Sequence, residues 1–224
     1  PFSNNATICS YPRFVEDNWC ALELSYDSLD KLAAEVNSAQ EVELPTGVGF
    51  CMYVRRDCLQ EIGYFNESAF GKGYGEENDL CRRALKSGWR NILAADTFVL
   101  HYGGASFGDS KKARMEVAGR ALAKLHPEYD AEVANFVGLD PVKPYRTALD
   151  CARLRRRKAG AVLFVLHNWG GGTDGHVRDL EEILHSQGVP TLQCRMVVGS
   201  KEEVVIDASQ GGDFPNLPLF NIAK

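Results

Sequence analysis

The feature that most constrains the fold is a strand, a glycine turn, a helix and a second strand in direct succession. Apolar residues 161–167 are followed by a glycine-rich turn at 170–175, an amphipathic helical pattern at 176–185 and a strand-like stretch at 191–196. A helix between two strands returns the chain to the same edge of the sheet, so the strands are expected to be parallel. The order predicts an α/β protein whose C-terminal part, from residue 159, opens as a Rossmann-like unit.

The preceding residues carry a second series of patterns. Expected elements are a loop-like start at 1–20, a helix at 27–37 behind an Asp cap, a strand at 49–54, a short helix at 57–62, a helix from 76 to about 87, a strand at 89–100 and a helix at 110–125. We therefore expect a larger folded unit at 1–140, a linker at 141–158 and the start of a second unit at 159–224.

The expected linker is a basic helical pattern containing Arg153, Arg155, Arg156 and Arg157. One interpretation is a helix face exposed to water, and another is contact with anionic lipid headgroups. The pattern alone leaves both open.

Composition limits the classes of function. The chain has 224 residues, of which 45% are hydrophobic, which is enough for one core and part of a second. Its formal net charge of -5 argues against a general nucleic-acid binder, because neutralising phosphates requires a basic surface. No apolar run approaches the roughly 18 residues of a membrane span. The first residue is Pro1, and we expect the chain to be an interior piece of a longer protein.

Cysteine usage indicates a reducing compartment. The seven cysteines are odd in number and scattered, without C-x-x-C pairs. We expect free thiols in a cytoplasmic protein.

Three acids are crowded at the expected start of the helix near residue 76, in the stretch GYGEENDLCRRA, residues 73–84. Acids at a helix N-terminus are stabilised by its partial positive charge, so Glu76, Glu77 and Asp79 can be purely structural. A general base must also be a positioned carboxylate, so the same acids suit catalysis. Successive helical residues turn by about 100°, so the three cannot all face one way.

Two glycine-rich loops are the other candidates. His101 ends a strand-like stretch and enters a loop with several glycines, where a metal or phosphate role and a structural role both fit. The turn at 170–175 formally matches G-x-G-x-x-G, but Arg195 and Met196 stand where the acid of a dinucleotide site is expected. A dinucleotide site, a plain tight turn and another nucleotide or sugar-phosphate role stay open there.

Three motifs, taken together, resemble the C-terminal half of family 2 glycosyltransferases with the GT-A fold. They are LPTGVGFCMYVRRDCLQEIGYFNE at 44–67, GEENDLCRRA at 75–84 and VLHYGGASFG at 99–108, in the order and spacing of that family. The family transfers a sugar with inversion from a nucleotide-sugar donor. The resemblance covers residues 1 to about 130.

The resemblance implies roles for particular residues. Glu77 would be the catalytic base, with Glu76 beside it, although the family usually has Asp at the second position. His101 would be a ligand to a divalent cation, Mn or Mg, or to the diphosphate. The other substrate-binding candidates are Gly47, Tyr74, Gly75, Gly103, Gly104 and Ser106. The Asp-x-Asp motif that holds the metal in the family is absent from these residues and is expected before Pro1.

The stretch VLHNWGGGTDGHVRDL at 165–180 is similar to the start of a family 4 glycosyltransferase, whose fold is GT-B. Tandem transferases of this kind imply a role in bacterial surface polysaccharide assembly, at the cytoplasmic face of the membrane. The implied partners are a nucleotide-sugar donor and a saccharide or lipid-linked saccharide acceptor, with possible peripheral membrane contact and no nucleic acid. The alternative functions are a carbohydrate-binding module without catalysis and a nucleotide-dependent oxidoreductase.

The acids are expected to divide their roles. Glu77 would face the acceptor, Glu76 would support the cleft and Asp79 would serve the helix N-terminus. Arg82 and Arg83 would contact diphosphate or remain solvated.

Overall fold

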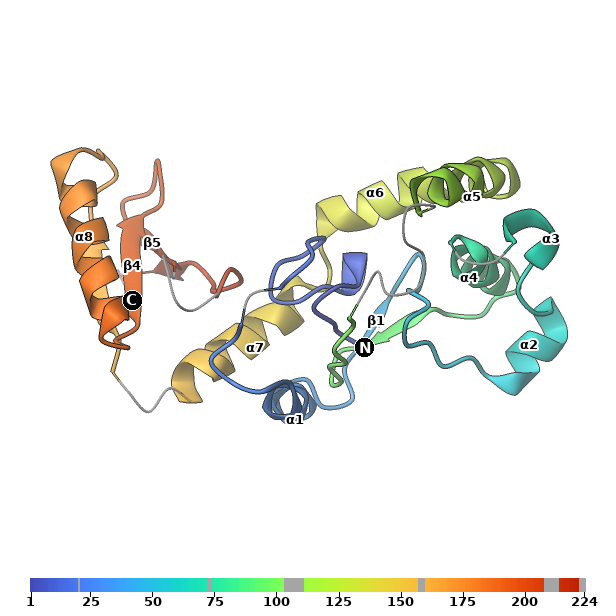
Figure 1. The fold of residues 1–224 in the computed structure, drawn as a ribbon, viewed down its shortest axis with the longest axis horizontal. Coiled ribbons are helices and arrows are strands. Elements are labelled where there is room, and N and C mark those ends of the chain that lie inside the picture. The colour runs from blue at the N-terminus through green and yellow to red at the C-terminus, as the bar shows by residue number, and fades with distance from the viewer. Residues whose placement is uncertain (20, 72–73, 103–110, 157–159, 208–213, 222–224) are drawn as a thin grey trace.

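The computed structural model describes residues 1–19, 21–71, 74–102, 111–156, 160–207 and 214–221. These residues form an α/β protein with helices α1 to α8 and two small sheets. Figure 1 shows an elongated arrangement in which α7 runs between the N-terminal elements and the C-terminal sheet with its helix α8. The predicted α/β class is confirmed.

The N-terminal core is built around a two-stranded sheet and helix α1. Strands β1 (Glu41–Glu43) and β2 (Ile92–Ala94) are antiparallel, and the buried Val42 faces Leu93. Helix α1 (Tyr26–Val36) begins at Ser25, whose side chain accepts a hydrogen bond from Ser28 N, so the expected Asp cap is wrong. Its apolar face is fully buried because Leu29, Leu32 and Ala33 recur at helical spacing.

The first residues belong to this core, although they contain only one short 3-10 helix, η1 (Thr7–Cys9). Phe2 N donates to Thr97 O at 2.8 Å, and Val99 N donates to Phe2 O at 2.9 Å. Phe2 and Tyr11 are both fully buried, with ring centroids 6.1 Å apart. The predicted loop-like segment is therefore irregular in backbone but packed as a core element.

Five helices follow within the larger part: α2 (Arg56–Ile62), α3 (Glu67–Phe70), α4 (Glu76–Lys86), α5 (Lys111–Leu125) and α6 (Tyr129–Leu139). Gly63 and Gly88 follow α2 and α4 with φ of 79° and 84°, a left-handed conformation that glycine adopts without strain. The predicted helices at 57–62, 76–87 and 110–125 are confirmed, whereas α3 and α6 were not predicted.

The predicted strand at 49–54 is not formed. Burial still alternates along the chain, with Val48, Phe50, Met52 and Val54 half-buried and the residues between them exposed. A strand also requires a hydrogen-bonding neighbour, and the described residues provide none for this stretch. The predicted strand at 89–100 is similarly reduced to β2 and an isolated bridge between Phe2 and Phe98.

Helix α7 (Lys143–Arg156) corrects the interpretation of 141–158 as an exposed linker. Arg146 and Arg153 are each 1% exposed, and Arg153 bonds to both Asp150, at 3.0 Å, and Glu23, at 2.8 Å. Leu149 and Ala152 join the N-terminal core. The basic pattern arises in part because this helix supplies buried cations to carboxylates, whereas Lys143 at its start and Arg155 and Arg156 at its end are exposed.

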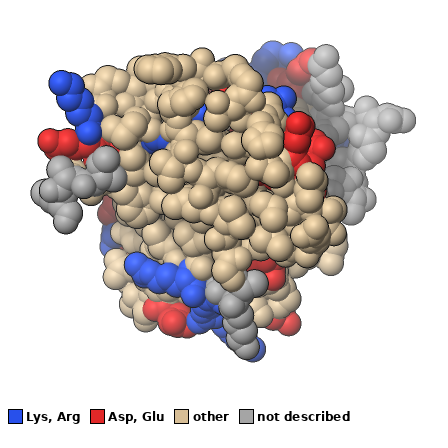
Figure 2. Space-filling model, turned by 90° about the vertical axis from the view of Figure 1, so that its left-hand side faces the viewer, with Lys and Arg blue, Asp and Glu red and all other residues tan. Residues whose placement is uncertain are grey.

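The C-terminal part forms a four-stranded sheet in the order β3-β4-β5-β6. Strands β3 (Val162–Leu166) and β4 (Thr191–Met196) are parallel and joined through α8 (Gly172–Ser186), which confirms the predicted strand–helix–strand unit. Strands β5 (Glu203–Asp207) and β6 (Phe220–Asn221) are antiparallel to their neighbours. Figure 2 views this end of the molecule, where charged side chains of both signs lie mainly around the periphery.

The structure also describes the state of the cysteines and the polarity of the helices. Cys9, Cys51, Cys58, Cys81, Cys151 and Cys194 are free thiols, as expected, and Cys20 lies outside the described residues. Within the described part of the chain, every helix is too short or too polar to cross a bilayer.

Candidate active site at the start of helix α4

The start of α4 is held by an unusual backbone. Gly75, the residue before the helix, has φ of 87°, and a Cβ placed on it would lie 2.9 Å from the ring of Phe70. Both the conformation and the space therefore require glycine. Tyr74 also has a positive φ, 79°, which is rare for a bulky side chain and is found preferentially at functional sites. This turn positions the next two residues, Glu76 and Glu77.

Glu77 is half-buried and lies against the backbone of Gly49. Its Cβ and Cγ atoms are each 3.6 Å from the position that a Gly49 Cβ would occupy. Burial raises the pKa of the Glu77 carboxyl. Backbone hydrogen bonds at residues 77 and 75 lower this pKa, and the negative charge of Glu76 raises it, so that the net pKa is raised. A carboxylate with a raised pKa is a stronger base, which is what proton removal from a hydroxyl requires.

Glu76 is also half-buried. Its Oε2 atom has no solvent exposure and no hydrogen-bond partner among the described residues. A buried oxygen without a partner costs free energy, so this atom suits a role in which a ligand supplies the missing donor.

Asp79 lies in the first turn of α4, as predicted, and its carboxyl is also paired with two side chains beyond that turn. It is 2% exposed, its Oδ1 accepts from His126 Nε2 at 2.8 Å and its Oδ2 accepts from Arg83 Nε at 2.8 Å. His126 Nδ1 lies 2.9 Å from Lys86 Nζ, which only donates, so Nδ1 accepts and Nε2 carries the proton. Asp79 therefore ties α4 to the corner between α5 and α6.

The two arginines of α4 are paired within the chain. Arg82 is buried and binds Glu128 at 3.2 Å and Glu132 at 2.9 Å, so the expectation that it is solvated is wrong. Arg83 binds Asp79 and donates to Tyr64 O at 2.8 Å, and 26% of its side chain is exposed. Contact of either arginine with a diphosphate stays a prediction.

Several polar groups near Glu77 were not identified from the sequence. Asn78 Nδ2 donates to Thr46 Oγ1 at 2.8 Å, and Tyr129 packs with Tyr74 against Phe70. Burial raises the pKa of Tyr129. No sequence motif marks Tyr129, because Phe70 and Tyr74 are remote from it in the chain.

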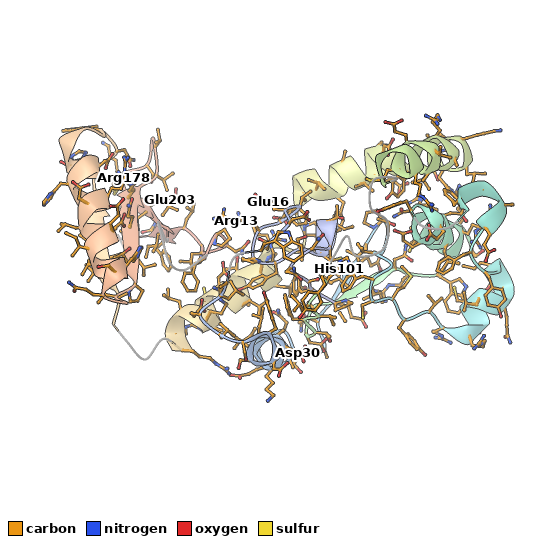
Figure 3. The ribbon with its side chains drawn as sticks, in the orientation of Figure 1. Arg13, Glu16, Asp30, His101, Arg178 and Glu203 are labelled. Atoms are coloured by element: carbon orange, nitrogen blue, oxygen red, sulfur yellow. The ribbon has the colours of Figure 1, made fainter. Side chains whose placement is uncertain are left out.

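His101 is fixed by the N-terminal segment (Figure 3). Its backbone N donates to Asn4 Oδ1 at 2.8 Å, and its ring stacks on Phe50 with centroids 4.7 Å apart. The ring Nδ1 lies 2.6 Å from Asn5 O. A carbonyl only accepts, so Nδ1 carries the proton and Nε2 presents a lone pair. This is the tautomer that a metal-binding histidine adopts.

Glu77 and His101 approach the same short stretch of backbone. Glu77 lies against Gly49, and His101 stacks on Phe50. Gly47, two residues earlier, donates from its N to Cys81 Sγ at 3.2 Å. Of the other candidates, Gly103, Gly104 and Ser106 lie outside the described residues, so their placement stays a prediction.

A metal site would need more ligands than His101. In the ranges that the structure describes, no group of three His, Cys, Asp or Glu side chains could hold an ion. Divalent cations such as Mn²⁺ or Mg²⁺ prefer several oxygen ligands, so one imidazole is insufficient. The described residues do not form a complete metal centre, although the His101 tautomer suits one ligand.

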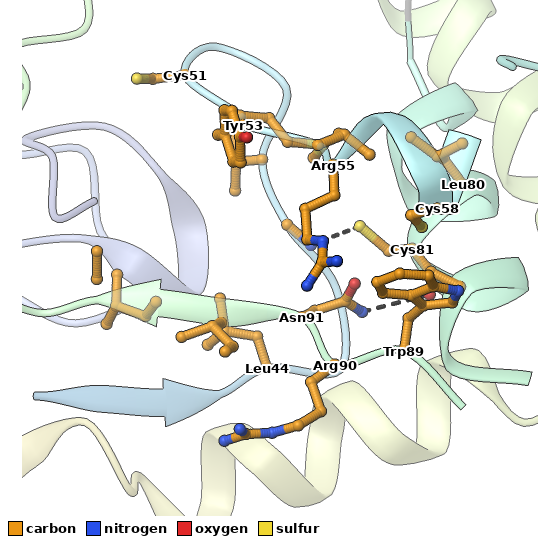
Figure 4. Close-up of a pocket in the computed structure, with 18 of the residues that line it drawn as sticks. Leu44, Cys51, Tyr53, Arg55, Cys58, Leu80, Cys81, Trp89, Arg90 and Asn91 are labelled. Carbon is orange, nitrogen blue, oxygen red and sulfur yellow. Dashed lines mark hydrogen bonds between the residues drawn. The ribbon is translucent and has the colours of Figure 1, made fainter. Parts of the chain in front are cut away.

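A separate pocket of about 400 Å³ lies on the side of residues 47–54 that faces α2, α4 and β2 (Figure 4). Its walls are largely apolar and include the thiols of Cys58 and Cys81, whose pKa values burial raises. Gly47 lines it, but Glu76, Glu77, Tyr74 and His101 do not. The described residues that line this pocket include no carboxylate or imidazole.

The glycine turn before α8 is closed by an ion pair. Arg195 Nη2 binds Asp174 Oδ1 at 2.7 Å, and Arg195 Nη1 donates to His167 O at 2.7 Å. A dinucleotide site needs an acid at the end of this second strand to accept from a ribose hydroxyl. An arginine paired with the first turn of α8 cannot do this, which argues against a dinucleotide site. A plain tight turn and another nucleotide or sugar-phosphate role both stay predictions.

Comparison with known proteins adds no relative: no family model, no curated protein and no solved structure matches the chain.

Proposed function

We propose that this chain is part of an inverting glycosyltransferase that moves a sugar from a nucleotide-sugar donor to an acceptor hydroxyl. The observation that carries the proposal is the placement of Glu77. Its carboxyl is half-buried at the start of α4, lies against Gly49 and has a pKa raised by burial and by Glu76. A carboxylate in this state is suited to accept the proton of an acceptor hydroxyl as that oxygen attacks the anomeric carbon.

The residues around Glu77 support this role in distinct ways. Gly49 lies beside the acid, since a Cβ there would be in ordinary van der Waals contact with the Glu77 side chain at 3.6 to 3.8 Å. Tyr74, held with a positive φ beside the helix start, is the aromatic candidate for stacking on a sugar ring. Glu76 keeps the pKa of Glu77 raised through like charge. Fixed positions of this kind lower the barrier by orienting the reacting groups.

The finer assignments belong to the same proposal. Residues 1–140 would be part of a GT-A domain and residues 159–224 the start of a GT-B-like domain, and the parallel β3–α8–β4 unit supports the second. The partners would be a nucleotide sugar and a saccharide or lipid-linked saccharide, in polysaccharide assembly at the cytoplasmic side of a membrane. The buried Arg153 removes part of the basis for lipid contact through α7.

The test is Glu77→Gln in the natural protein that contains this chain, assayed for sugar transfer and for acceptor binding. We expect transfer to fall by at least about a hundredfold, the low end for losing a general base, with acceptor binding nearly intact. The control is Glu67→Gln, an exposed acid of α3. Equal loss of binding and transfer would favour a carbohydrate-binding module, and unchanged transfer would contradict the proposal.

The same variant reports on folding. Because the pKa of Glu77 is raised in the folded protein, its stabilising contribution is present at low pH and is lost as pH rises through the folded pKa. Glutamine does not ionise, so at neutral pH Glu77→Gln should be at least as stable as the wild type. A lower melting temperature would mean that lost activity reflects unfolding.

A further inference from the structure

The pocket beside residues 47–54 is large enough to hold a small molecule. Its volume of about 400 Å³ lies within the range of ligand-binding pockets. An apolar cavity of roughly 150 Å³ already holds a benzene ring, so this pocket has room for about two fused rings. The half-buried side chains of Val48, Phe50, Met52 and Val54 line it. The pocket therefore accounts for the alternating burial along a stretch that is not a strand.

Sulfur atoms are concentrated around this pocket. Met52 lines it together with four of the seven cysteines, Cys9, Cys51, Cys58 and Cys81. The Met52 methyl lies 2.8 Å from the position that a Gly47 Cβ would occupy, and Cys81 Sγ lies 3.5 Å from the same point. Sulfur is polarisable and makes favourable contacts with aromatic rings. This wall therefore suits an aromatic ring.

The charged side chains of the lining are already paired with acids outside it. Arg55 Nη2 lies 2.5 Å from Asp57 Oδ2, and Arg90 Nε lies 2.6 Å from Glu43 Oε1. Burial raises the pKa of the Cys9 thiol to about 11, so this thiol is neutral at physiological pH. A charged ligand would lose its hydration without gaining an unpaired side chain of opposite charge among the described lining residues. The pocket therefore suits an uncharged ligand.

Asn91 supplies a polar group in the lining. Its Nδ2 donates to Cys81 O at 3.3 Å, a bond drawn as a dashed line in Figure 4. The amide oxygen Oδ1 is the remaining acceptor, and no described residue donates a hydrogen bond to it. A ligand with one O–H or N–H group can provide this donor.

We propose that this pocket binds an uncharged aromatic molecule with a single hydrogen-bond donor. The ring lies against the sulfur-lined wall around Met52 and Cys81, and the donor binds Asn91 Oδ1. The site is distinct from the acids at the start of α4, because neither Glu76 nor Glu77 lines it. The proposal does not depend on the proposed function, because its measurements use no sugar transfer.

The test is an NMR titration with 2-naphthol at pH 7, where this two-ring probe is uncharged. Methionine methyl groups are labelled with 13C, and the Met52 signal is assigned with Met52→Leu. We expect the Met52 signal to move and to saturate with a Kd below about 1 mM. Met115 and Met196, which lie outside the pocket lining, are internal controls and should not move. No saturable change at Met52, or equal changes at all three, would overturn the proposal.

Three related probes each remove one feature of the ligand. We expect 2-naphthoate, which is charged, to bind at least about tenfold more weakly. 2-Methoxynaphthalene lacks the donor and should bind at least about threefold more weakly. Decahydro-2-naphthol lacks the aromatic rings and should bind at least about twofold more weakly. Equal affinity for any of the three would show that the corresponding part of the proposal is wrong.

Two variants that fill the pocket locate the bound probe. Ala84→Leu and Val54→Phe add carbon atoms at lining positions and should each weaken 2-naphthol binding at least about tenfold. Val54 is half-buried, so it accepts a larger side chain more easily if the buried Ala84 does not. Val117→Phe, at a side chain of α5 that is 51% exposed, is the control and should bind like the wild type. Circular dichroism checks that each variant is folded. Wild-type affinity in folded Val54→Phe would overturn the proposal.

Discussion

Single residues at the start of α4 have different roles because their surroundings differ. Glu77 faces Gly49 and carries a carboxyl whose pKa is raised, whereas Asp79, two positions later, is paired with His126 and Arg83. A rotation of about 200° over two helical residues separates the two side chains. An acid suited to catalysis and an acid with structural partners can therefore lie two positions apart in one helix without sharing contacts.

Asp79→Asn tests the structural role. The change leaves Arg83 and the His126 N–H without a charged partner in a buried position, so we expect a loss of about 3 kcal/mol of unfolding free energy. Chemical denaturation of the wild type and variant measures it. Asp57→Asn, at an exposed ion pair with Arg55, is the matched control and should cost much less, because solvent screens exposed ion pairs. A loss below about 1 kcal/mol for Asp79→Asn would indicate that Asp79 stabilises the protein only through the helix dipole.

The roles of these acids could be predicted only in part. The spacing of Glu76, Glu77 and Asp79 gives the relative directions of their side chains, because the helix has a fixed period. It does not identify the partner that each meets. His126 is 47 residues from Asp79 in the chain, so a single sequence contains no signal for this contact.

Among the elements, helices are predictable where their end signals are local. Helices α2 and α4 end at Gly63 and after Ser87 as expected, because a left-handed glycine ends a helix by itself. The stretch at 49–54 has the alternation of a strand but no partner in the described structure, since pairing depends on distant residues. The sequence predicts the helix of α7 but not the burial of its arginines, because a basic pattern ordinarily indicates a helix face exposed to solvent.

Helix α7 offers the test at this scale. Arg153 is 1% exposed and bonds to Glu23, Asp150 and the hydroxyl of Tyr11. Arg153→Met keeps the length of the side chain but leaves these acids unpaired, so we expect a loss of about 3 to 5 kcal/mol. Arg155→Met, on the exposed side of the same helix, should stay within about 0.5 kcal/mol. Thermal or denaturant unfolding compares the two, and equal effects would contradict the buried role.

At the scale of the whole molecule, α7 joins the two parts that the sequence separates. Asn216 Nδ2 donates to Asp150 Oδ2 at 2.9 Å and to Pro12 O at 2.9 Å, and its Oδ1 accepts from Arg146 Nε at 3.0 Å. The ring of Phe214 lies 4.5 Å from the guanidinium of Arg153. The C-terminal segment therefore packs on the same polar face of α7 that holds the N-terminal core. The change of composition along the chain predicts a boundary between the two parts, but it does not predict the contact between them.

Asn216→Ala tests whether this contact couples the two parts. The change removes one side-chain bond each from Asp150, Arg146 and Pro12, all of them at buried positions, so we expect a loss of about 1 to 3 kcal/mol. Amide hydrogen exchange locates the effect. Because the lost bonds fasten the C-terminal segment, protection should fall in β3 and β4 while β1 and β2 keep theirs. Gln187→Ala, at an exposed amide after α8, is the control. An equal loss of protection in both sheets would mean that the two parts unfold as one cooperative unit. Unchanged protection in both sheets would mean that other contacts, such as that of the Phe214 ring with Arg153, hold the two parts together.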